Sequence, residues 1–568
     1  MTISANYPTI RPTLMLDFAN SAELDPRITF TRSTTANYYD GKTSVLAEQN
    51  LLLQSNTFGT TWVTTNGTLG AGVTDPAGST TAYSLTATAS NATVYQTLTL
   101  TATPYTISFW IQRVTGTGTI NLTLDGTNFT AVTVTGSWVK YTATATPTAA
   151  SHTIGIQVTT SGDVINIYGA QLENRSSATA TNITTTAALN NYIPVLLSAP
   201  ANQARFDHDP VAGTSLGLLI EQQSTNLQLQ SQSFTVSPWT AGYSSNVAVT
   251  PNINIAPDGT QTASLLVNTT ATGNHYLAPS NIGGSYTSGQ IVTNTVYAKA
   301  YTARYLYIAY AGSQNNLAQF DLVAGTATII AGSDTCAIQA VGNGWYRCTY
   351  YRTLTTTIIE RLNLTSSPTT LTSSTWNSFT GDGYTGVYIW GVQVEYLAFP
   401  TSYIPTTSAA VTRTADTPLN SGANFSSWFN SQQGAIYCSF DTPTISSSAS
   451  SMAIWAIDNG TNAQYYINKS TATLTAYEGS ANASMGTITA STLQQSVYSF
   501  NNNSVSASGL INGGSVGTIT ATPQSIAPTQ LSIGRYATSS NPFTGHIRKF
   551  AYYPTATTTA QMQALTGS

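Results

Sequence analysis

Four short motifs occur twice along the chain in the same order, and this internal repeat constrains the fold more than any other feature. The motifs are an Asn/Leu/Gln run leading to Phe and Trp, a Gly/Thr-rich turn, a Trp followed two residues later by a basic residue, and an Ile–aromatic–Gly–x–Gln–x–Glu segment. The matched segments are 50–62 with 226–239, 75–82 with 257–263, 136–141 with 343–348, and 167–173 with 389–395. Agreement in both order and residue type predicts two copies of one β-sandwich module, the second with longer loops.

The residues in and around the repeat favour β-strands. Thr, Val, Ile, Tyr, Phe and Trp suit a pleated surface, and polar and apolar residues alternate in 117–123 and 387–394. Asn-Gly and Asp-Gly pairs, which favour hairpin turns, separate such runs at 125, 258, 343, 459 and 512. This pattern predicts an all-β fold of tandem antiparallel β-sandwiches of the jelly-roll type. Minimal helix is expected, at 558–564, where Thr residues precede good helix formers.

Charged residues are scarce, and this excludes several classes of protein. They make up 7% of the 568 residues, and the net charge is −4. Coiled coils need abundant Glu, Lys and Arg, and electrostatic binding of nucleic acid needs a basic surface. The longest apolar run, 216–220, is far shorter than the roughly 18 residues of a membrane span, so no membrane insertion is expected. The first residues lack the layout of a signal peptide, which predicts synthesis in the cytoplasm.

Three cysteines, Cys336, Cys348 and Cys438, are too few for a disulfide framework in a chain of this length. Cys336 and Cys348 flank a predicted hairpin. Either a cross-strand bridge or two buried free thiols fits that arrangement.

The repeat divides the chain into five parts. We expect a discontinuous N-terminal β subdomain that also attaches the protein, formed by 1–49 together with 176–225. The remaining parts are a first jelly-roll module at 50–175, a second at 226–399, a linker at 400–420 and a terminal sandwich at 421–568.

Three strings outside the modules carry a resemblance to a known family. They are LDF…LDPRITFTRSTTA at 16–36, RFDHDP…SLGLLIE at 205–221, and GVQVE…FPTSYIPTTSAAVTR at 391–413. The chain resembles bacteriophage virion proteins described as head-spike, tail-fibre or carbohydrate-binding tail proteins. The end of the chain is similar to the closing strand and helix of concanavalin-type, laminin-G-like sandwiches. Because the first module is inserted between the first two strings, the N-terminal subdomain is expected to be discontinuous.

The resemblance implies a location and partners. It implies assembly in the host cytoplasm, display on the exterior of the virion, contacts with capsid, baseplate or tail proteins, and a homo-oligomer, most often a trimer. It also implies binding to host surface polysaccharide. The stretch up to Phe18, with Pro8 and Pro12, is expected to form an extended arm that attaches to another virion protein.

Candidate polar sites are few. Residues 205–210, Arg-Phe-Asp-His-Asp-Pro, form the densest titratable cluster, which is either a polar or metal-binding site or an ion-paired strand end and turn. Glu173 and Glu395 end equivalent strands of the two modules, where similar carbohydrate-binding jelly rolls often hold a structural Ca²⁺ with oxygen ligands. They are candidate Ca²⁺ ligands or residues that close the sandwich. No other cofactor is expected.

Aromatic residues are the candidate sugar-binding groups. Tyr305 and Tyr307 share one face of an extended segment, and Trp376 and Trp428 lie in polar, loop-like stretches. Each of these side chains could instead pack within the protein or against another subunit.

Three functions remain. The first is a virion adhesin that binds host glycans, which suits a surface rich in Thr, Ser and Asn. The second is a polysaccharide depolymerase, which would need two carboxylates across a sugar; no spacing in the sequence singles out such a pair. The third is a structural capsid or tail component without a ligand. We therefore expect a non-enzymatic adhesin.

Overall fold

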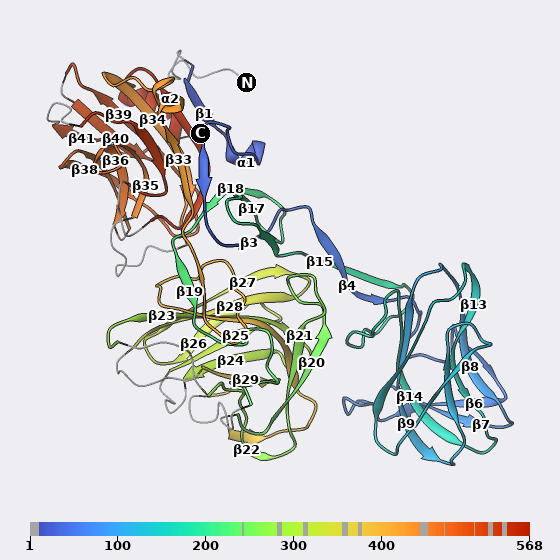
Figure 1. Ribbon diagram of the computed structural model, residues 1–568. Helices are drawn as coiled ribbons and strands as arrows, with labels where there is room; N and C mark the ends of the chain where they lie inside the picture. The colour runs from blue at the N-terminus through green and yellow to red at the C-terminus, as the bar shows by residue number, and fades with distance from the viewer. Residues whose placement is uncertain are drawn as a thin grey trace.

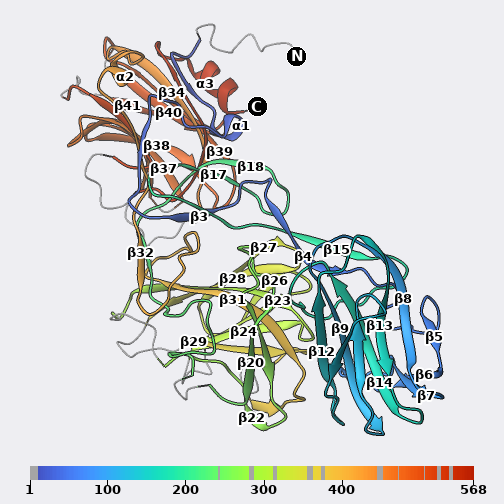
Figure 2. The same cartoon turned by 45° about the vertical axis from the view of Figure 1, so that its right-hand side comes forward.

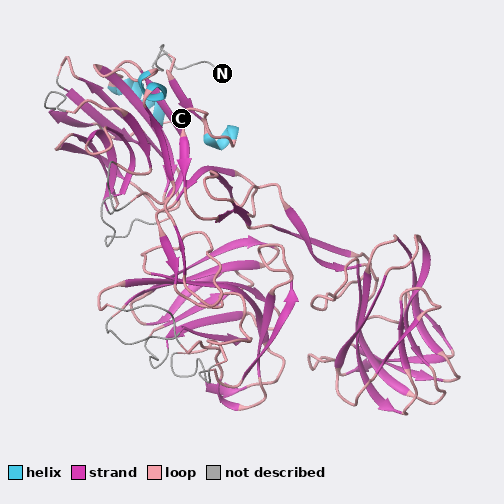
Figure 3. Ribbon diagram, viewed as in Figure 1, coloured by secondary structure: helices cyan, strands magenta, loops and turns pink. Residues whose placement is uncertain are grey.

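The computed structural model describes residues 11–240, 244–280, 287–310, 316–354, 362–372, 378–443, 452–470, 472–504, 506–520, 526–536 and 542–567. Three β-sandwiches are visible in Figure 1. Strands dominate the fold, and the helices of the described residues are short (Figure 3). They are α1 (Phe18–Ser21), α2 (Ala423–Ser426) and α3 (Thr559–Thr566). The predicted all-β class of tandem antiparallel sandwiches is confirmed.

Module 1, blue to teal in Figure 1, consists of two five-stranded antiparallel sheets. The first has the order β11 (Phe129–Val132), β10 (Ile120–Thr123), β13 (Ala150–Val158), β8 (Ala92–Leu100), β5 (Val63–Thr65). The second has the order β12 (Val139–Ala145), β9 (Tyr105–Thr115), β14 (Val164–Glu173), β7 (Ala82–Ala87), β6 (Gly67–Val73). Alternate side chains of β9, such as Ile107, Phe109 and Ile111, are completely buried between the sheets, as the period of two in a strand requires.

Module 2, green to yellow, repeats this design with a larger sheet. Its six-stranded sheet has the order β20 (Val247–Asn254), β21 (Ala263–Asn268), β31 (Gly386–Glu395), β23 (Ile291–Ala300), β28 (Trp345–Thr353), β27 (Thr335–Gly342). The facing sheet has the order β26 (Thr326–Ala331), β25 (Leu317–Asp321), β24 (Tyr305–Tyr310), β29 (Leu362–Ser367), and β22 (Thr272–Asn274) pairs separately with β30 (Ser378–Thr380). The predicted turn at Asn343-Gly344 joins β27 to β28, and both residues have positive φ, 48° and 73°. Asn-Gly is the pair that accepts this conformation most readily.

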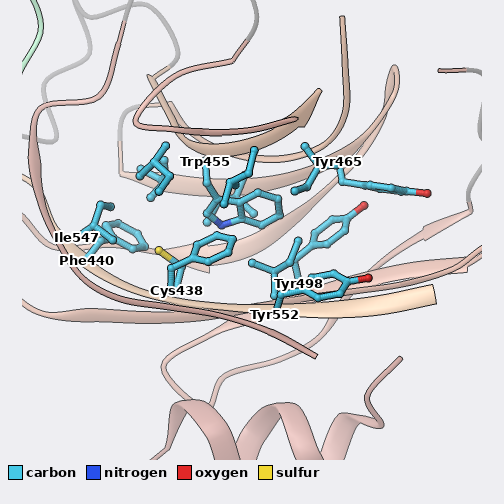
Figure 4. Packing of buried hydrophobic residues seen from close by; sticks show 14 of the residues in the cluster. Cys438, Phe440, Trp455, Tyr465, Tyr498, Ile547 and Tyr552 are labelled. Atoms are coloured by element: carbon cyan, nitrogen blue, oxygen red, sulfur yellow. The ribbon is translucent and has the colours of Figure 1, made fainter. Parts of the chain in front are cut away.

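The C-terminal sandwich, orange to red, has an eight-stranded and a seven-stranded sheet. The larger has the order β17 (Arg205–His208), β18 (Ser215–Ile220), β43 (Gly545–Tyr553), β34 (Gln433–Asp441), β39 (Gln494–Asn501), β40 (Ser506–Ile511), β41 (Gly517–Thr520), with β1 (Leu14–Leu16) also paired to β43. The other has the order β2 (Thr29–Thr31), β33 (Thr417–Ser421), β42 (Gln530–Ile533), β35 (Met452–Asp458), β36 (Ala463–Ser470), β37 (Thr473–Glu478), β38 (Ala481–Thr487). Figure 4 shows aromatic side chains, among them Trp455, Tyr465 and Tyr498, packed between these sheets.

The N-terminal segments are arranged differently from the predicted separate subdomain. Strands β1, β2, β17 and β18 complete the sheets of the C-terminal sandwich. Leu14 lies opposite Tyr552 and is completely buried. The N-terminal and C-terminal parts of the chain thus share one hydrophobic core. Without the strands of the other part, each would leave apolar side chains and strand edges exposed.

Two-stranded ribbons connect the sandwiches. They are β3 (Ala36–Tyr38) with β16 (Leu197–Ala199), β4 (Ser44–Asn50) with β15 (Leu189–Pro194), and β19 (Ser224–Asn226) with β32 (Val411–Arg413). The first two lead from the C-terminal sandwich to module 1, as Figures 1 and 2 both show. Ala47 of β4 and Ile193 of β15 lie in a buried cluster with Trp345 and Trp390 of module 2. The β4–β15 ribbon therefore packs against the outer face of the six-stranded sheet.

The predicted linker 400–420 is also structured, since it includes β32 and the start of β33. The C-terminal helix is present over Thr559–Thr566, where Thr558 and Gln561 form a capping box. None of the helices in the described ranges has the length and hydropathy of a bilayer-crossing segment.

Candidate functional site

A cleft of about 530 Å³ lies where module 2, the C-terminal sandwich and the N-terminal segments meet. We call it the central cleft. Strands β27 and β28 of module 2 line one side, and β43 with the end of β34 lines another. Residues 37–39 and 207–210 supply further walls. Clefts at domain junctions with aromatic walls and a few placed polar groups are the usual sites of ligand binding.

His546 links two carboxylates at the C-terminal-sandwich side of this cleft. Its Nδ1 lies 2.7 Å from Asp441 Oδ1, and its Nε2 lies 3.2 Å from Asp207 Oδ2. Asp441 and His546 face each other in the β34–β43 register, and Asp207 comes from β17. Burial opposes the imidazolium charge, but the attraction of Asp441 and the hydrogen bonds to both carboxylates raise the pKa of His546 to about 10. The imidazolium is thus charged at neutral pH and offsets part of the negative charge of the two carboxylates.

The predicted cluster 205–210 is divided between two roles. Asp207 also accepts a hydrogen bond from the Tyr39 backbone N–H at 2.8 Å. Asp209 accepts the N–H groups of Val211 and Ala212 and so stabilises the turn after β17, as predicted for the ion-paired strand end and turn. In the described ranges, no group of three or more His, Cys, Asp or Glu side chains is arranged to hold a metal ion.

Arg205 belongs to a buried ionic cluster behind the cleft, which we call the hub. It comprises Arg32, Arg205, Glu221, Arg413 and Asp416, each at most 3% exposed. Asp416 binds Arg32 at 2.9 Å and Arg205 at 2.5 Å, while Glu221 lies 2.7 Å from Arg205 and 3.5 Å from Arg413. Burial favours the neutral form of Glu221, yet the charges of Arg413 and Arg205 hold its pKa well below the usual range.

Tyrosines form much of the remaining cleft wall. Tyr38, Tyr39, Tyr297, Tyr351 and Tyr403 all line it. Burial raises the pKa of Tyr39, Tyr297 and Tyr351, so these phenols stay protonated and serve as neutral hydrogen-bond groups. The guanidinium of Arg347 lies 5.8 Å from the centroid of the Tyr297 ring, within the range of a cation–π contact.

Glu173 and Glu395 occupy matching positions, as the repeat predicts. Both are completely buried. Glu173 accepts the backbone N–H and the hydroxyl of Thr179 at 2.8 and 2.6 Å, and Glu395 accepts the same two groups of Thr401 at 3.1 and 2.5 Å. Ser224 and Gln393 also donate to Glu395. Donors therefore face both oxygens of each carboxylate, which is the environment of a structural acceptor that closes the sandwich.

The predicted sugar-binding aromatics that the structure describes do not form one site, since Trp428 belongs to the C-terminal sandwich and Tyr305 and Tyr307 to module 2. Trp376 lies outside the described residues. Trp428 is 4% exposed, donates to Asn420 and packs 4.9 Å from the Tyr552 ring. Tyr307 is completely buried, and its hydroxyl donates to Gln319. Trp428 and Tyr307 are therefore core residues, because their polar atoms are satisfied internally.

Tyr305 differs from these two because its ring is only half-buried. It lies 6.4 Å from the Tyr307 ring and 5.4 Å from the guanidinium of Arg304. Of the named aromatics within the described residues, Tyr305 is the one that keeps surface for a ligand.

The predicted attachment arm is partly folded into the protein. Pro8 lies outside the described residues, and Pro12 is half-buried beside β1. Phe18 is 1% exposed within the core of the C-terminal sandwich. Phe18 is thus an internal anchor of this chain and not a contact for another virion protein.

The three cysteines are free thiols. Cys336 lies opposite Tyr350 and Cys348 opposite Ile338, so the two are diagonal across the β27–β28 hairpin. Burial raises the pKa of Cys336 to about 11 and that of Cys348 further.

The central cleft itself could not be predicted from the sequence, because its residues come from segments more than 500 positions apart. Two features of the sequence belong to the cleft. They are the cluster that contains Asp207 and Asp209, and Arg347, the basic residue that follows the repeated Trp in the second module.

Comparisons with known proteins give distant similarities of fold. No protein-family model matches the sequence, and no curated protein resembles it closely enough to count as a match. The CBM40 module of the Ruminococcus gnavus IT-sialidase, solved with α2,3-sialyllactose, is 17% identical over 24% of this chain and 83% of its own, with a TM-score of 0.21.

Two further solved structures are similarly distant. The tandem CBM22 domains of Paenibacillus barcinonensis Xyn10C are 13% identical over 62% of this chain and 99% of their own, with a TM-score of 0.19. The LG4–5 domains of the mouse laminin α1 chain are 11% identical over 50% and 86%, with a TM-score of 0.18. Similarities of this size carry no functional information.

Proposed function

We propose that this protein is a bacteriophage virion adhesin, a tail-fibre or head-spike protein that binds host surface glycans in the central cleft. The observation that supports it best is the cleft, which combines tyrosine rings with fixed polar groups in a volume of about 530 Å³. Sugars present apolar C–H faces and rings of hydroxyls. Such ligands suit a site with aromatic walls and a few oriented hydrogen-bond partners.

The virion part of the proposal comes from the sequence. The strings at 205–221 and 391–413 resemble phage spike and fibre proteins. These strings also build the hub and the cleft walls in the structure. On this basis the protein is displayed on the particle exterior as a homo-oligomer, which we take to be a trimer. Sedimentation equilibrium of the purified protein tests the oligomer, and labelling of purified particles tests the location.

A depolymerase is the second function to consider, but the cleft geometry favours binding over hydrolysis. A glycosidase needs one carboxylate as proton donor and another as nucleophile or base. Asp207 and Asp441 both line the cleft, but each is hydrogen-bonded to the His546 imidazole, so neither is held ready as a proton donor or nucleophile for a sugar. Incubation with host polysaccharide and a reducing-sugar assay tests this, and release of sugar would favour the enzyme.

The binding proposal is tested with the full chain and two matched variants. Tyr38→Ala with Tyr351→Ala removes two half-buried rings from the cleft. Tyr192→Ala, 59% exposed on the ribbon, is the control outside the cleft. We expect the double variant to bind host cells at least tenfold more weakly, which corresponds to about 1.4 kcal/mol, and the control to bind like the unaltered protein. Absence of binding by the unaltered protein to any susceptible strain would leave only the structural role.

A further inference from the structure

Arg347 lies on β28 in the wall of the central cleft, and within the described ranges it forms no ion pair with a carboxylate. In the described part of the chain, most other arginines are paired with an acid. Those that form ion pairs are Arg27, Arg32, Arg113, Arg175, Arg205, Arg304, Arg352, Arg413 and Arg548. Arg347 instead donates through Nη2 to the Thr401 carbonyl and stacks on Tyr297. Among the described residues its Nε is buried without an acceptor and its Nη1 has none.

The acids around the cleft do not compensate this charge, because each is already engaged. Asp441 and Asp207 bind His546, and Asp441 also lies 3.6 Å from Arg548. Glu221 is held between Arg205 and Arg413. Arg347 is thus a cleft-lining cation that forms an ion pair with none of these acids.

A second polar group of the same cleft has no partner. Tyr39 is 8% exposed and lines the cleft, and its buried hydroxyl has no hydrogen-bond partner in the part of the chain that the structure describes. Buried polar atoms without a partner are rare in native proteins and call for an explanation. A ligand in the cleft that reaches this hydroxyl would supply the missing bond.

We infer that the central cleft selects acidic sugars and that Arg347 binds the sugar carboxylate, with the tyrosine rings against the apolar face of the ring. Arginine is suited to this role because its planar guanidinium presents several N–H donors to a carboxylate. The inference rests on the proposed function, since it names the class of glycan that the same site would take.

The test uses the full-length protein and a panel of polysaccharides that carry uronic or nonulosonic acids. Each member is paired with its carboxyl-reduced form, and dextran sulfate represents sulfate esters. Binding is measured by biolayer interferometry. The variants are Arg347→Gln and Arg347→Lys. Arg27→Gln, which removes a partly exposed charge at a residue that does not line the cleft, is the matched control.

We expect at least one acidic member to bind at least tenfold more tightly than its carboxyl-reduced form. Arg347→Gln should abolish this preference, Arg347→Lys should retain part of it, and Arg27→Gln should leave it unchanged. A melting temperature for Arg347→Gln within a few degrees of the unaltered protein separates lost recognition from lost folding. If Arg347→Gln does not fold, two other results test the inference. They are the preference of the unaltered protein for the acidic form over its carboxyl-reduced form, and the intermediate affinity of Arg347→Lys for the acidic form.

Several outcomes would overturn the inference. They are equal binding of the paired forms, a preference for dextran sulfate, or binding of no acidic member. If the unaltered protein still binds host cells in any of these cases, the proposed function stands and only the inference is wrong. If it does not bind host cells either, both the inference and the proposed function are wrong.

Discussion

At the scale of single residues, two buried glutamates show how differently this protein treats its few charges. Glu221 is surrounded by arginines and hydrogen-bond donors, and these hold its pKa well below the usual range. Glu478, at the end of β37, is 1% exposed, and neither of its oxygens has a hydrogen-bond partner among the described residues. Burial raises the pKa of Glu478 to about 7. One side chain is therefore ionised at neutral pH, and the other is half-protonated.

The pH dependence follows from the difference between folded and unfolded chains. Below pH about 4.5, Glu478 is protonated in both states and contributes nothing to the pH dependence. As the pH rises from 4.5 to 7, the unfolded chain releases the proton first, so the folded state loses stability, by up to about 3 kcal/mol. We expect Glu478→Gln to raise the melting temperature at pH 8 and to have little effect at pH 4.

Calorimetry of Glu478→Gln across this pH range is the measurement, with Glu221→Gln as the comparison. The comparison variant should lower the melting temperature at pH 8, because it removes a carboxylate that pairs with Arg205 and Arg413 of the hub and accepts hydrogen bonds from Ser402. A Glu478→Gln protein that is less stable at pH 8 than the unaltered chain would show that the ionised carboxylate has a partner.

At the scale of elements, the two modules match hydrogen bond by hydrogen bond. Asn50 and Asn226 are each completely buried and each make four bonds with strands and closing segments of their own module. The partners are Ala170, Asn182, Leu52 and Leu172 for Asn50, and Val392, Ile404, Gln228 and Val394 for Asn226. Each module ends with a matching segment, 179–184 or 401–406, that Glu, Asn and Ser side chains of the module hold in place.

This match gives an internal replicate for a mutational test. Asn226→Ala should destabilise module 2 by about 3 kcal/mol, since four buried backbone groups lose their partner. Hydrogen exchange followed by mass spectrometry should show lost protection in β31 and in 401–406, with module 1 unchanged. Asn50→Ala should do the same in module 1 alone. Asn274→Ala, at an exposed position of the same module, should change neither.

The internal repeat shows which parts of the fold can be predicted from the sequence. The order of motifs predicts two sandwiches, because each module makes its own local contacts. The closing segments were missed, although Thr179 and Thr401 stand at the same distance after their Glu residues; instead, 400–420 is predicted as a linker. The cleft and the hub could not be predicted, since Arg32, Arg205 and Asp416 become neighbours only through tertiary packing. Burial, which removed Trp428 and Tyr307 from the candidate site, is likewise a tertiary property.

At the scale of the whole molecule, the hub fixes module 2 against the C-terminal sandwich. Ser402 of the second closing segment donates its N–H and its hydroxyl to Glu221 at 2.6 Å. Asp416 joins arginines from two other parts of the chain. Module 1 has alanine at the position of Ser402 and is connected instead through the β4–β15 ribbon, where Glu48 pairs with Lys299 of module 2.

Asp416→Asn should therefore loosen this junction. Removal of one partner from a buried ion pair costs about 3–5 kcal/mol, because the opposite charges stay buried. We expect a lower melting temperature, a larger radius of gyration in small-angle X-ray scattering and weaker glycan binding. Asp25→Asn, which breaks a partly exposed pair with Arg27, should cost about 1 kcal/mol or less and leave the scattering curve unchanged.

The pairing of β1 with β43 has a consequence for how the protein is made. These strands are separated by more than 500 residues, yet they lie side by side in one sheet. On the ribosome, modules 1 and 2 have their own sheets and can fold as they emerge, whereas the sandwich must wait for its last strand. Until then Leu14, Leu16 and Phe18 lack their neighbours in the core. A chain that ends before β43 would keep this apolar segment exposed. The first residues are therefore protected from aggregation and proteolysis only once synthesis is complete.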